Sequence, residues 1–273
     1  MTTPGTITAI IATYNDAAGL EKTLRSIREQ AVQPTEVIVI DGGSTDSTRA
    51  LLASSGDVVT VWRSEPDGGI YHALNKGLRL ASGDWILVLG AGDTLAVPDA
   101  IEILQGAAAR CTRGMVYFNV NCCQGDQTLY VFALGPVGEL RRRYGQAPPF
   151  HHQGVILRRS WIERIGLFDT SYSIHADYLL MGRIFAEGGA DFIPAALTNF
   201  QLGGASTPSM RRLLTKLREL RRINRQFDNR RSFWRRKYLQ LSLTGMAHGI
   251  LGPTATARMK ARIYRWFLQP DRR

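Results

Sequence analysis

The run from Val37 to Ile40, which ends directly in Asp41, constrains the fold more than any other stretch of this chain. Its four β-branched residues show no polar alternation, a pattern typical of a strand covered on both faces in a parallel sheet. Two glycines and the capping residues Ser44, Thr45 and Asp46 follow. Open α/β sheets bind ligands at the carboxyl ends of their strands, so Asp41 is predicted to lie at a binding edge. The simpler alternative is a solvated loop carboxylate.

The neighbouring segments predict the same architecture. Strands are expected at 6–13, 36–40, 58–62 and 85–89, alternating with helices at 18–30, 44–53, 70–80 and one beginning near Pro98. This alternation predicts an α/β fold with a doubly wound, mostly parallel sheet. Strands at 115–120 and 129–134, around a turn at Gly125, predict an antiparallel extension. A strand at 153–157 and a helix at 177–186 complete the expected domain.

Positive charge is concentrated in the last quarter of the chain. Residues 205–273 contain 18 Lys or Arg and three Asp or Glu, in a chain of net charge +11. We therefore predict an α/β domain over 1–205 and a basic amphipathic helical region over 206–273. Apolar residues from Leu213 to Phe227 share one helical face, and such a face fits an interfacial helix on an anionic membrane. Alternatively, these helices pack on the domain. No nucleic-acid-binding module accompanies the charge, so no nucleic-acid partner is expected.

The cysteines and the N-terminal residues predict a cytoplasmic protein. Cys111, Cys122 and Cys123 lack metal-ligand spacing, and the adjacent pair is expected to lie in a strand rather than in a disulfide. The first residues carry no basic segment of the kind that begins a signal peptide. The longest uncharged stretch, 238–251, is too short and too polar to span a bilayer.

Polar side chains follow three of the predicted strands. Thr13 and Tyr14 end the first, Asp41 ends the second, and Asp93 follows Gly92 after the fourth. A carboxylate at Asp41 can accept from the imide of uracil or from a guanine edge, and Tyr14 can stack on a base. Asp93 can hold Mg²⁺ or Mn²⁺ against a diphosphate, because hard cations take oxygen ligands. The sequence therefore predicts a nucleotide site.

Four motifs, in this order and spacing, resemble those of family-two glycosyltransferases of the GT-A fold. They are Ile11-Ala12-Thr13-Tyr14-Asn15, residues 41–46 (DGGSTD), residues 67–77 (DGGIYHALNKG) and Ala81-Ser82-Gly83-Asp84. The resemblance covers about residues 6–205. It implies an enzyme that uses nucleotide-diphosphate sugars in making bacterial polysaccharides or glycolipids.

The resemblance also implies roles for particular residues. Asp93 would hold the metal, although Gly92 stands where the family often has a second acid. Asp177 would be the catalytic base, and its simpler interpretation is a helix N-cap. The nucleotide would be bound by Thr13, Tyr14, Asp41, Asp67 and Asn75, and the acceptor or phosphate side would be formed by His152, Gln153 and His175.

The expected function is inverting transfer of a sugar from a nucleotide-diphosphate donor, expected to be a UDP-sugar, to a lipid-linked glycan or glycolipid. The enzyme would be cytoplasmic and peripheral on the inner face of the cell membrane. One alternative is a non-catalytic GT-A scaffold that recruits partners at the membrane. The other is a sugar nucleotidyltransferase, in which a basic glycine-rich loop typically follows the first strand. Residues 13–16 (TYND) lack that character.

Overall fold

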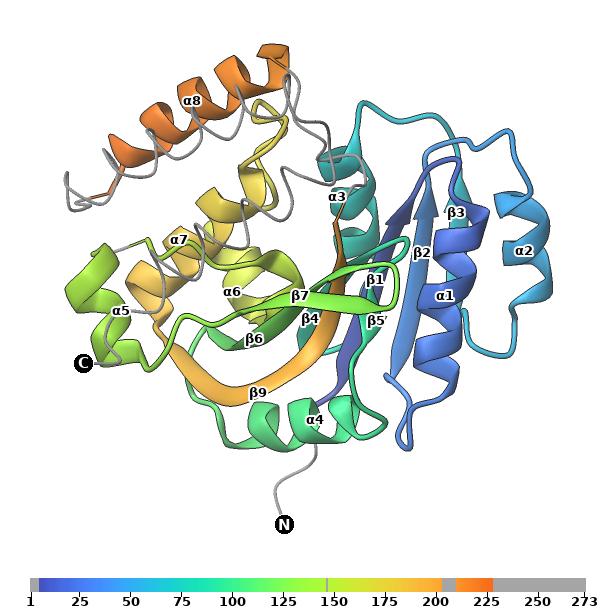
Figure 1. Ribbon diagram of the computed structural model, residues 1–273, viewed down its shortest axis with the longest axis horizontal. Helices are drawn as coiled ribbons and strands as arrows, with labels where there is room; N and C mark the ends of the chain where they lie inside the picture. Colours follow the sequence, from blue (N-terminus) through green and yellow to red (C-terminus); the bar gives the residue numbers. More distant parts are fainter. Residues whose placement is uncertain (1–4, 146, 203–209, 228–273) are drawn as a thin grey trace.

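The computed structural model describes residues 5–145, 147–202 and 210–227, and one curved sheet runs through this part of the chain (Figure 1). The strand order is β3-β2-β1-β4-β8-β6-β9-β5, and β7 pairs with β6. The strands are β1 (Ile7–Thr13), β2 (Glu36–Asp41), β3 (Val61–Ser64), β4 (Trp85–Gly90), β5 (Thr94–Leu95), β6 (Met115–Gln124), β7 (Gln127–Phe132), β8 (Val155–Arg158) and β9 (Ala190–Gln201). The helices are α1 (Ala17–Arg28), α2 (Thr48–Ser54), α3 (Ile70–Leu80), α4 (Ala100–Arg110), α5 (Val137–Tyr144), α6 (Arg159–Ile165), α7 (Ala176–Gly188) and α8 (Met210–Asn224).

Strands β1 to β4 confirm the predicted parallel, doubly wound half, although β3 is short and begins at Val61 rather than at the predicted residue 58. β1 lies between β2 and β4, and all three run parallel. Successive residues of β1 point to opposite faces, so Ile11 packs with α1 and α4 while Ile10 packs with α3 and α7. Because both faces are covered by helices, the strands need no polar alternation, as the run before Asp41 predicts.

The antiparallel extension is also confirmed, with more strands than the sequence predicts. β8 pairs antiparallel with both β4 and β6, and β9 runs parallel to β6. β9 contains Pro194, and its pairing with β6 shifts register near Asn119. Local periodicity is irregular in such a strand, which is why no strand is expected there from the sequence. The free, buried cysteines Cys122 and Cys123 lie in β6, as predicted.

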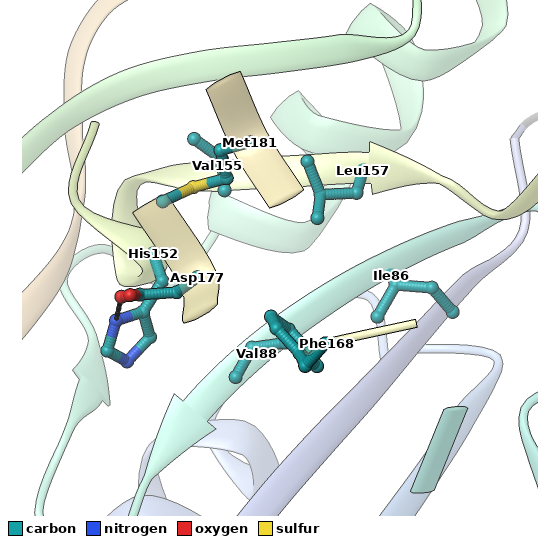
Figure 2. A pocket seen from close by; sticks show the side chains of 8 residues that line it. All are labelled: Ile86, Val88, His152, Val155, Leu157, Phe168, Asp177 and Met181. Carbon is teal, nitrogen blue, oxygen red and sulfur yellow. Dashed lines mark hydrogen bonds and ion pairs between the residues drawn. The ribbon is translucent and has the colours of Figure 1, made fainter. Parts of the chain in front are cut away.

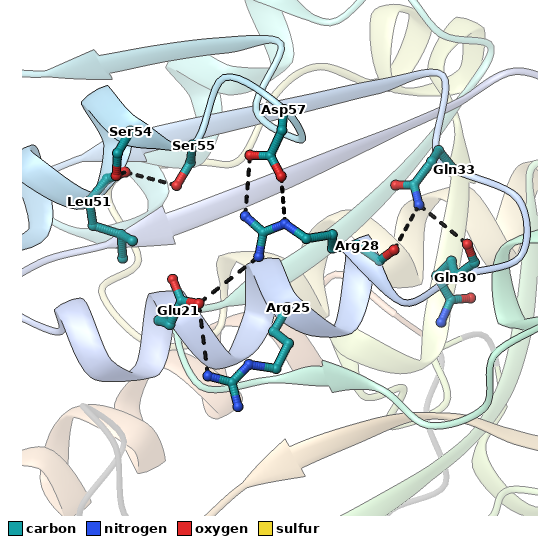
Figure 3. A network of polar contacts seen from close by, with 9 residues as sticks. All are labelled: Glu21, Arg25, Arg28, Gln30, Gln33, Leu51, Ser54, Ser55 and Asp57. Carbon is teal, nitrogen blue, oxygen red and sulfur yellow. Dashed lines mark hydrogen bonds and ion pairs between the residues drawn. The ribbon is translucent and has the colours of Figure 1, made fainter.

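Helix α2 begins later than predicted, at Thr48, because the residues before it are used as a loop. The backbone N–H of Ser44 donates to Asp41, and that of Thr45 donates to Asn15. On the outer side of the domain, Arg28 of α1 forms a two-point ion pair with Asp57, at 2.6 and 3.2 Å, which joins α1 to the segment after α2 (Figure 3).

Helix α8 packs on the domain through part of the predicted apolar face. Leu220, Ile223 and Phe227 are buried in the same core as α7, while Leu214 is half exposed. The ring of Phe227 lies over Gly182 of α7, where an added Cβ would come within 2.9 Å of it. The predicted division of the chain at residue 205 stays a prediction, and residues 228–273 lie outside the described part. Within that part, no helix is long and apolar enough to cross a membrane.

Candidate active site

The carboxyl ends of β1, β2 and β4 meet at one edge of the sheet, as the sequence predicts. Thr13 lies opposite Asp41 in the β1–β2 register, and Ala12 lies opposite Gly90 in the β1–β4 register. The residues predicted for the nucleotide and the metal therefore come from neighbouring strands. Thr13 is buried, and its hydroxyl has no hydrogen-bond partner among the described residues.

Asp41 is fully buried and organises the loop that follows β2. Its carboxylate accepts from the backbone N–H of Ser44 at 3.0 and 3.2 Å, and from the hydroxyl of Ser64 at 2.6 Å. The hydroxyl of Ser44 also donates to Asp41 and accepts from the N–H of Asn15. The structure thus gives Asp41 a role in holding two strand-end loops together. Its contact with a nucleobase stays a prediction.

Tyr14, Gly42 and Asp67 form the open part of this edge. Tyr14 is 64% exposed. A Cβ added at Gly42 would lie 3.3 Å from the Tyr14 ring and 3.3 Å from a carboxylate oxygen of Asp67. The other Asp67 oxygen accepts from the N–H of Gly69, the N-cap residue of α3. An exposed ring beside a fixed carboxylate is suited to a nucleoside, and the absence of a side chain at Gly42 leaves the space between them.

Asp93 is held in the turn between β4 and β5. One oxygen accepts from the N–H of Gly90 and from the side-chain amide of Gln153, both at 2.8 Å. The other accepts from the N–H of Gln201 at 3.2 Å. Asp93 is 3% exposed, and this burial raises the pKa of its carboxyl group. The turn depends on Gly92, whose φ of +92° suits glycine.

Asp177 lies in the first turn of α7 and contacts two other elements. Its Oδ2 lies 2.9 Å from Nδ1 of His152 (Figure 2). Its Oδ1 lies 2.9 Å from the hydroxyl of Tyr71 on α3 and accepts from the N–H of Tyr178. The sequence alternative of an N-cap is wrong, because His175 occupies that position and Asp177 lies inside the helix.

Burial alone would raise the pKa of Asp177, but the hydrogen bond and charge of His152 outweigh it and lower the pKa to about 2. Burial in turn opposes protonation of His152, yet Asp177 outweighs this and raises the pKa of the imidazole above its ordinary value. Burial and the charge of Asp177 raise the pKa of Tyr71, so its hydroxyl stays protonated. Asp177 is therefore an ionised carboxylate that accepts from His152 on Oδ2 and from the N–H of Tyr178 on Oδ1. The one proton of the Tyr71 hydroxyl is shared between Oδ1 of Asp177 and the carbonyl of Ile174, which lies 2.6 Å away.

The loop before Asp177 is fixed from two sides. The side-chain amide of Asn75 donates to the carbonyl of Phe168 at 2.9 Å and accepts from its N–H at 3.0 Å. Asn75 therefore supports this loop through two hydrogen bonds. Its contact with the nucleotide stays a prediction. From α8, the buried carboxylate of Glu219 accepts from the N–H groups of Ser173, Ile174 and His175 at 2.7, 3.1 and 2.9 Å.

The predicted acceptor-side residues separate into two groups. His152 and Gln153 lie in the short turn before β8 and contact Asp177 and Asp93, respectively. The ring of His175 instead lies 3.3 Å from Glu219 on α8. A contact of His175 with acceptor or phosphate stays a prediction.

Sequence reasoning missed Tyr71 and Glu219 as parts of this site. Tyr71 lies within the third motif, residues 67–77. A tyrosine at a buried helix position needs a partner for its hydroxyl, and this requirement could have indicated its role. Residues 205–273 contain 18 basic residues and three acids, of which Glu219 is one, and a rare acid in a basic segment is a signal for a specific partner.

Comparison with known proteins identifies the family. The model of glycosyl transferase family 2 matches residues 8–166. An uncharacterized glycosyltransferase of Mycobacterium tuberculosis is 33% identical over 195 residues, which are 68% of this chain and 72% of the relative. A PGL/p-HBAD biosynthesis glycosyltransferase of Mycobacterium bovis is 30% identical over 196 residues, 70% of this chain and 72% of that protein.

A solved structure with the same fold is the mannosyltransferase of Pyrobaculum calidifontis in complex with GDP-Man and Mn²⁺. It superposes with a TM-score of 0.61 at 21% identity, over 98% of this chain and 82% of that one. The fold is that of GT-A glycosyltransferases, as expected from the motifs. With more than half of its length matched by the family model, the chain belongs to glycosyl transferase family 2 and is a glycosyltransferase.

Proposed function

We propose that this glycosyltransferase is an inverting enzyme, which moves a sugar from a nucleotide-diphosphate donor to a lipid-linked glycan or a glycolipid. The main support is that two consecutive residues, His152 and Gln153, connect the predicted base Asp177 with the predicted metal ligand Asp93. Gln153 donates to Asp93 at 2.8 Å, and His152 lies 2.9 Å from Asp177. Direct displacement needs a leaving-group side and a proton-accepting side at fixed separation. Asp93 and Asp177 fit these two sides.

The nucleoside would lie over Tyr14 at the ends of β1 and β2. The exposed Tyr14 ring and the Asp67 carboxylate flank the space above Gly42. Thr13 offers a buried hydroxyl without a partner among the described residues. We expect a UDP-sugar, with a GDP-sugar as the alternative, since the Pyrobaculum relative was solved with GDP-Man. Asp41 would act on the base or through the loop that it holds.

The residues at Asp93 fit a divalent cation, Mn²⁺ or Mg²⁺. Its Oδ1 accepts one long hydrogen bond, so a lone pair remains for a ligand. A cation would also offset the burial that raises the pKa of Asp93. Among the described residues no group of three His, Cys, Asp or Glu is placed to hold a metal, so the donor diphosphate would supply further oxygens. When bound, the cation would stabilise the charge of the leaving diphosphate.

We also place the enzyme at the inner face of the cell membrane, in contact through its basic C-terminal region. On α8 the apolar residues Leu220 and Ile223 are buried, whereas Arg218 and Arg221, and Arg225 just after the helix, are exposed. Contact through α8 would therefore be electrostatic rather than by insertion. Co-sedimentation of the full chain with vesicles containing anionic lipid tests this, and binding should fall as salt rises. Equal binding to neutral vesicles would refute it.

Calorimetry with UDP and GDP, each with and without Mn²⁺, tests the donor site. We expect metal-dependent binding of one nucleotide and its release from the matching nucleotide sugar. Asp93→Asn should abolish the metal dependence. Asp99→Asn, which changes an exposed acid at the N-cap of α4, is the matched control and should bind as the wild type does. If neither UDP nor GDP binds in the presence of Mn²⁺, the result supports the alternative of a non-catalytic GT-A scaffold. Membership of glycosyl transferase family 2 argues against the alternative of a sugar nucleotidyltransferase.

A further inference from the structure

The two carboxylate oxygens of Asp177, the predicted base, have different surroundings. Oδ1 accepts from the N–H of Tyr178 at 2.8 Å and lies 2.9 Å from the hydroxyl of Tyr71, whose proton is shared with the carbonyl of Ile174. Oδ2 lies 2.9 Å from Nδ1 of His152, and this is its one hydrogen bond among the described residues. Because a carboxylate oxygen has two lone pairs, Oδ2 keeps one of them for the hydroxyl of an acceptor.

The recess around this carboxylate offers little that would stabilise its charge. It has an empty volume of about 230 Å³, and its lining is apolar apart from Asp177 and His152 (Figure 2). Val88 of β4 and Met181 of α7 belong to this lining. Such surroundings favour the protonated form of a carboxyl group, and a protonated carboxyl group cannot take a further proton from an acceptor. A base in this place therefore needs a donor that keeps it ionised.

His152 is the strongest such donor. Burial has the largest effect on the pKa of Asp177 and raises it, but the hydrogen bond and charge of His152, with a smaller effect of the charge of His175, lower it to about 2. The other ionisable side chains that face Asp177 or His152 are Tyr71 on α3, Asp93 after β4, His151 beside His152, and Glu219 on α8, which lies against His175. None of these others donates a full hydrogen bond to Oδ2, so that contact belongs to His152.

We propose that His152 is a positioning residue for Asp177, and that its Nδ1–H bond fixes this carboxylate and keeps it able to take the acceptor proton. The proposal rests on the proposed glycosyl transfer. As the acceptor oxygen bonds to the anomeric carbon, its proton passes to Oδ2 of Asp177. The bond from that carbon to the diphosphate oxygen breaks, and its electron pair leaves on the diphosphate. Because an ionised carboxylate only accepts, Nδ1 carries the bridging proton in both the neutral and the charged ring.

Substitutions of His152 separate its hydrogen bond from the volume of its ring. His152→Ala removes both, and His152→Phe keeps a ring without a donor. With the donor gone, burial should raise the pKa of Asp177 above its ordinary 3.8. His152→Asn places an amide N–H near the position of Nδ1 and should restore part of the effect. His72→Asn, which removes an exposed histidine of α3, is the control and should titrate as the wild type does.

Carbon NMR of the aspartate carboxyl groups follows this titration without turnover. The signal of Asp177 is the one that Asp177→Asn lacks. In the wild type it should stay at its ionised position down to about pH 5. In His152→Ala and His152→Phe it should titrate with a midpoint above about pH 5, because burial is no longer offset. An Asp177 that stays ionised down to about pH 5 in whichever of these two variants folds would overturn the proposal.

The pH dependence of turnover gives a second readout, which a purely structural role of His152 would not produce. The probe reaction is release of UDP or GDP from UDP-N-acetylglucosamine, UDP-glucose or GDP-mannose, with water as the acceptor. The ratio of wild-type kcat to that of His152→Ala should be at least about twofold larger at pH 5 than at pH 8, because Asp177 becomes ionised again as the pH rises. A ratio that is the same at both pH values would overturn the proposal.

The two readouts also separate this proposal from the proposed function. If no donor reacts with the wild type, the proposed function fails, and the carboxyl titration still decides whether His152 keeps Asp177 ionised. If donors react while Asp177 stays ionised in the variants that lack the His152 donor, the proposed function stands and the role of His152 fails.

Discussion

Glu219 provides the sharpest test of how helix α8 supports the loop before Asp177. Its Oε1 accepts from the N–H and hydroxyl of Ser173 at 2.7 and 2.9 Å, and its Oε2 accepts from the N–H groups of Ile174 and His175. In Glu219→Gln one oxygen remains for Ser173. The other two N–H groups then face an amide that cannot accept their protons.

The expected loss follows from these two stranded donors. Hydrogen bonds to charged groups contribute about 1.5–3 kcal/mol each, and an unsatisfied buried donor costs about 1–3 kcal/mol. Because the Glu219 side chain is 10% exposed, water relieves part of this cost. We expect Glu219→Gln to lower the free energy of unfolding by about 2–4 kcal/mol, and Glu219→Ala by at least as much.

Urea unfolding of the full chain, followed by circular dichroism, measures this change. Arg218→Ala, at the preceding exposed position of α8, is the control and should change stability by less than about 0.5 kcal/mol. Activity at a temperature where the variant is folded should also fall, because the loop leads into Asp177. A loss below about 0.5 kcal/mol in Glu219→Gln would refute the role assigned to this carboxylate.

The stability difference between the wild type and Glu219→Gln should depend on pH. Burial opposes ionisation of Glu219, but hydrogen bonds from His175 and Ser173 outweigh it and lower the pKa below its ordinary 4.5. A carboxyl group with a lowered folded pKa stabilises fully above its unfolded pKa, and this contribution is lost as the pH falls through the folded pKa. The difference between wild type and Glu219→Gln should therefore be largest near neutral pH and shrink below about pH 4.5.

Three further substitutions test the site in simpler ways. Gly92→Ala forces a side chain onto a φ of +92° and should cost about 1–3 kcal/mol of unfolding free energy in a thermal melt. Asn75→Ala removes both hydrogen bonds to the Phe168 backbone and should cost about 2–4 kcal/mol in urea unfolding, with donor-nucleotide affinity from calorimetry unchanged if Asn75 acts only on this loop. Tyr71→Phe removes the hydroxyl that contacts Asp177 and should lower kcat about tenfold in the nucleotide-release assay; an unchanged kcat would show that this contact is dispensable.

The sequence predicts the first half of the fold well because its strands have both faces covered. Uninterrupted β-branched runs and glycine-rich ends mark the strands that lead to Asp41 and Asp93, and the parallel topology then brings these ends together. The second half is less predictable. β9 is irregular in register, and its position in the sheet depends on pairing with β6 rather than on any local pattern.

The candidate site is likewise only partly predictable from the sequence. Residues at strand ends are predictable from their position, but contacts across long sequence separations are not. Tyr71 meets Asp177 across 106 positions, and Glu219 reaches the 173–175 loop from a helix that the sequence assigns to a separate region. The amphipathic pattern of 213–227 correctly predicts a helix. It does not reveal that Leu220 and Ile223 are covered by α7 and its neighbours, because one apolar face can pack on protein or on lipid.

The position of Glu219 also has a consequence for the order in which the enzyme is made. Synthesis proceeds from the N-terminus, and a domain generally folds as a unit. Asp41, at the end of β2, and Asp93, in the turn after β4, precede α8 by more than a hundred residues. The N–H groups of 173–175 are therefore made well before their carboxylate partner, and Asp93 likewise waits for Gln153 and Gln201. We expect the loop before Asp177 to be secured only after α8 has been translated.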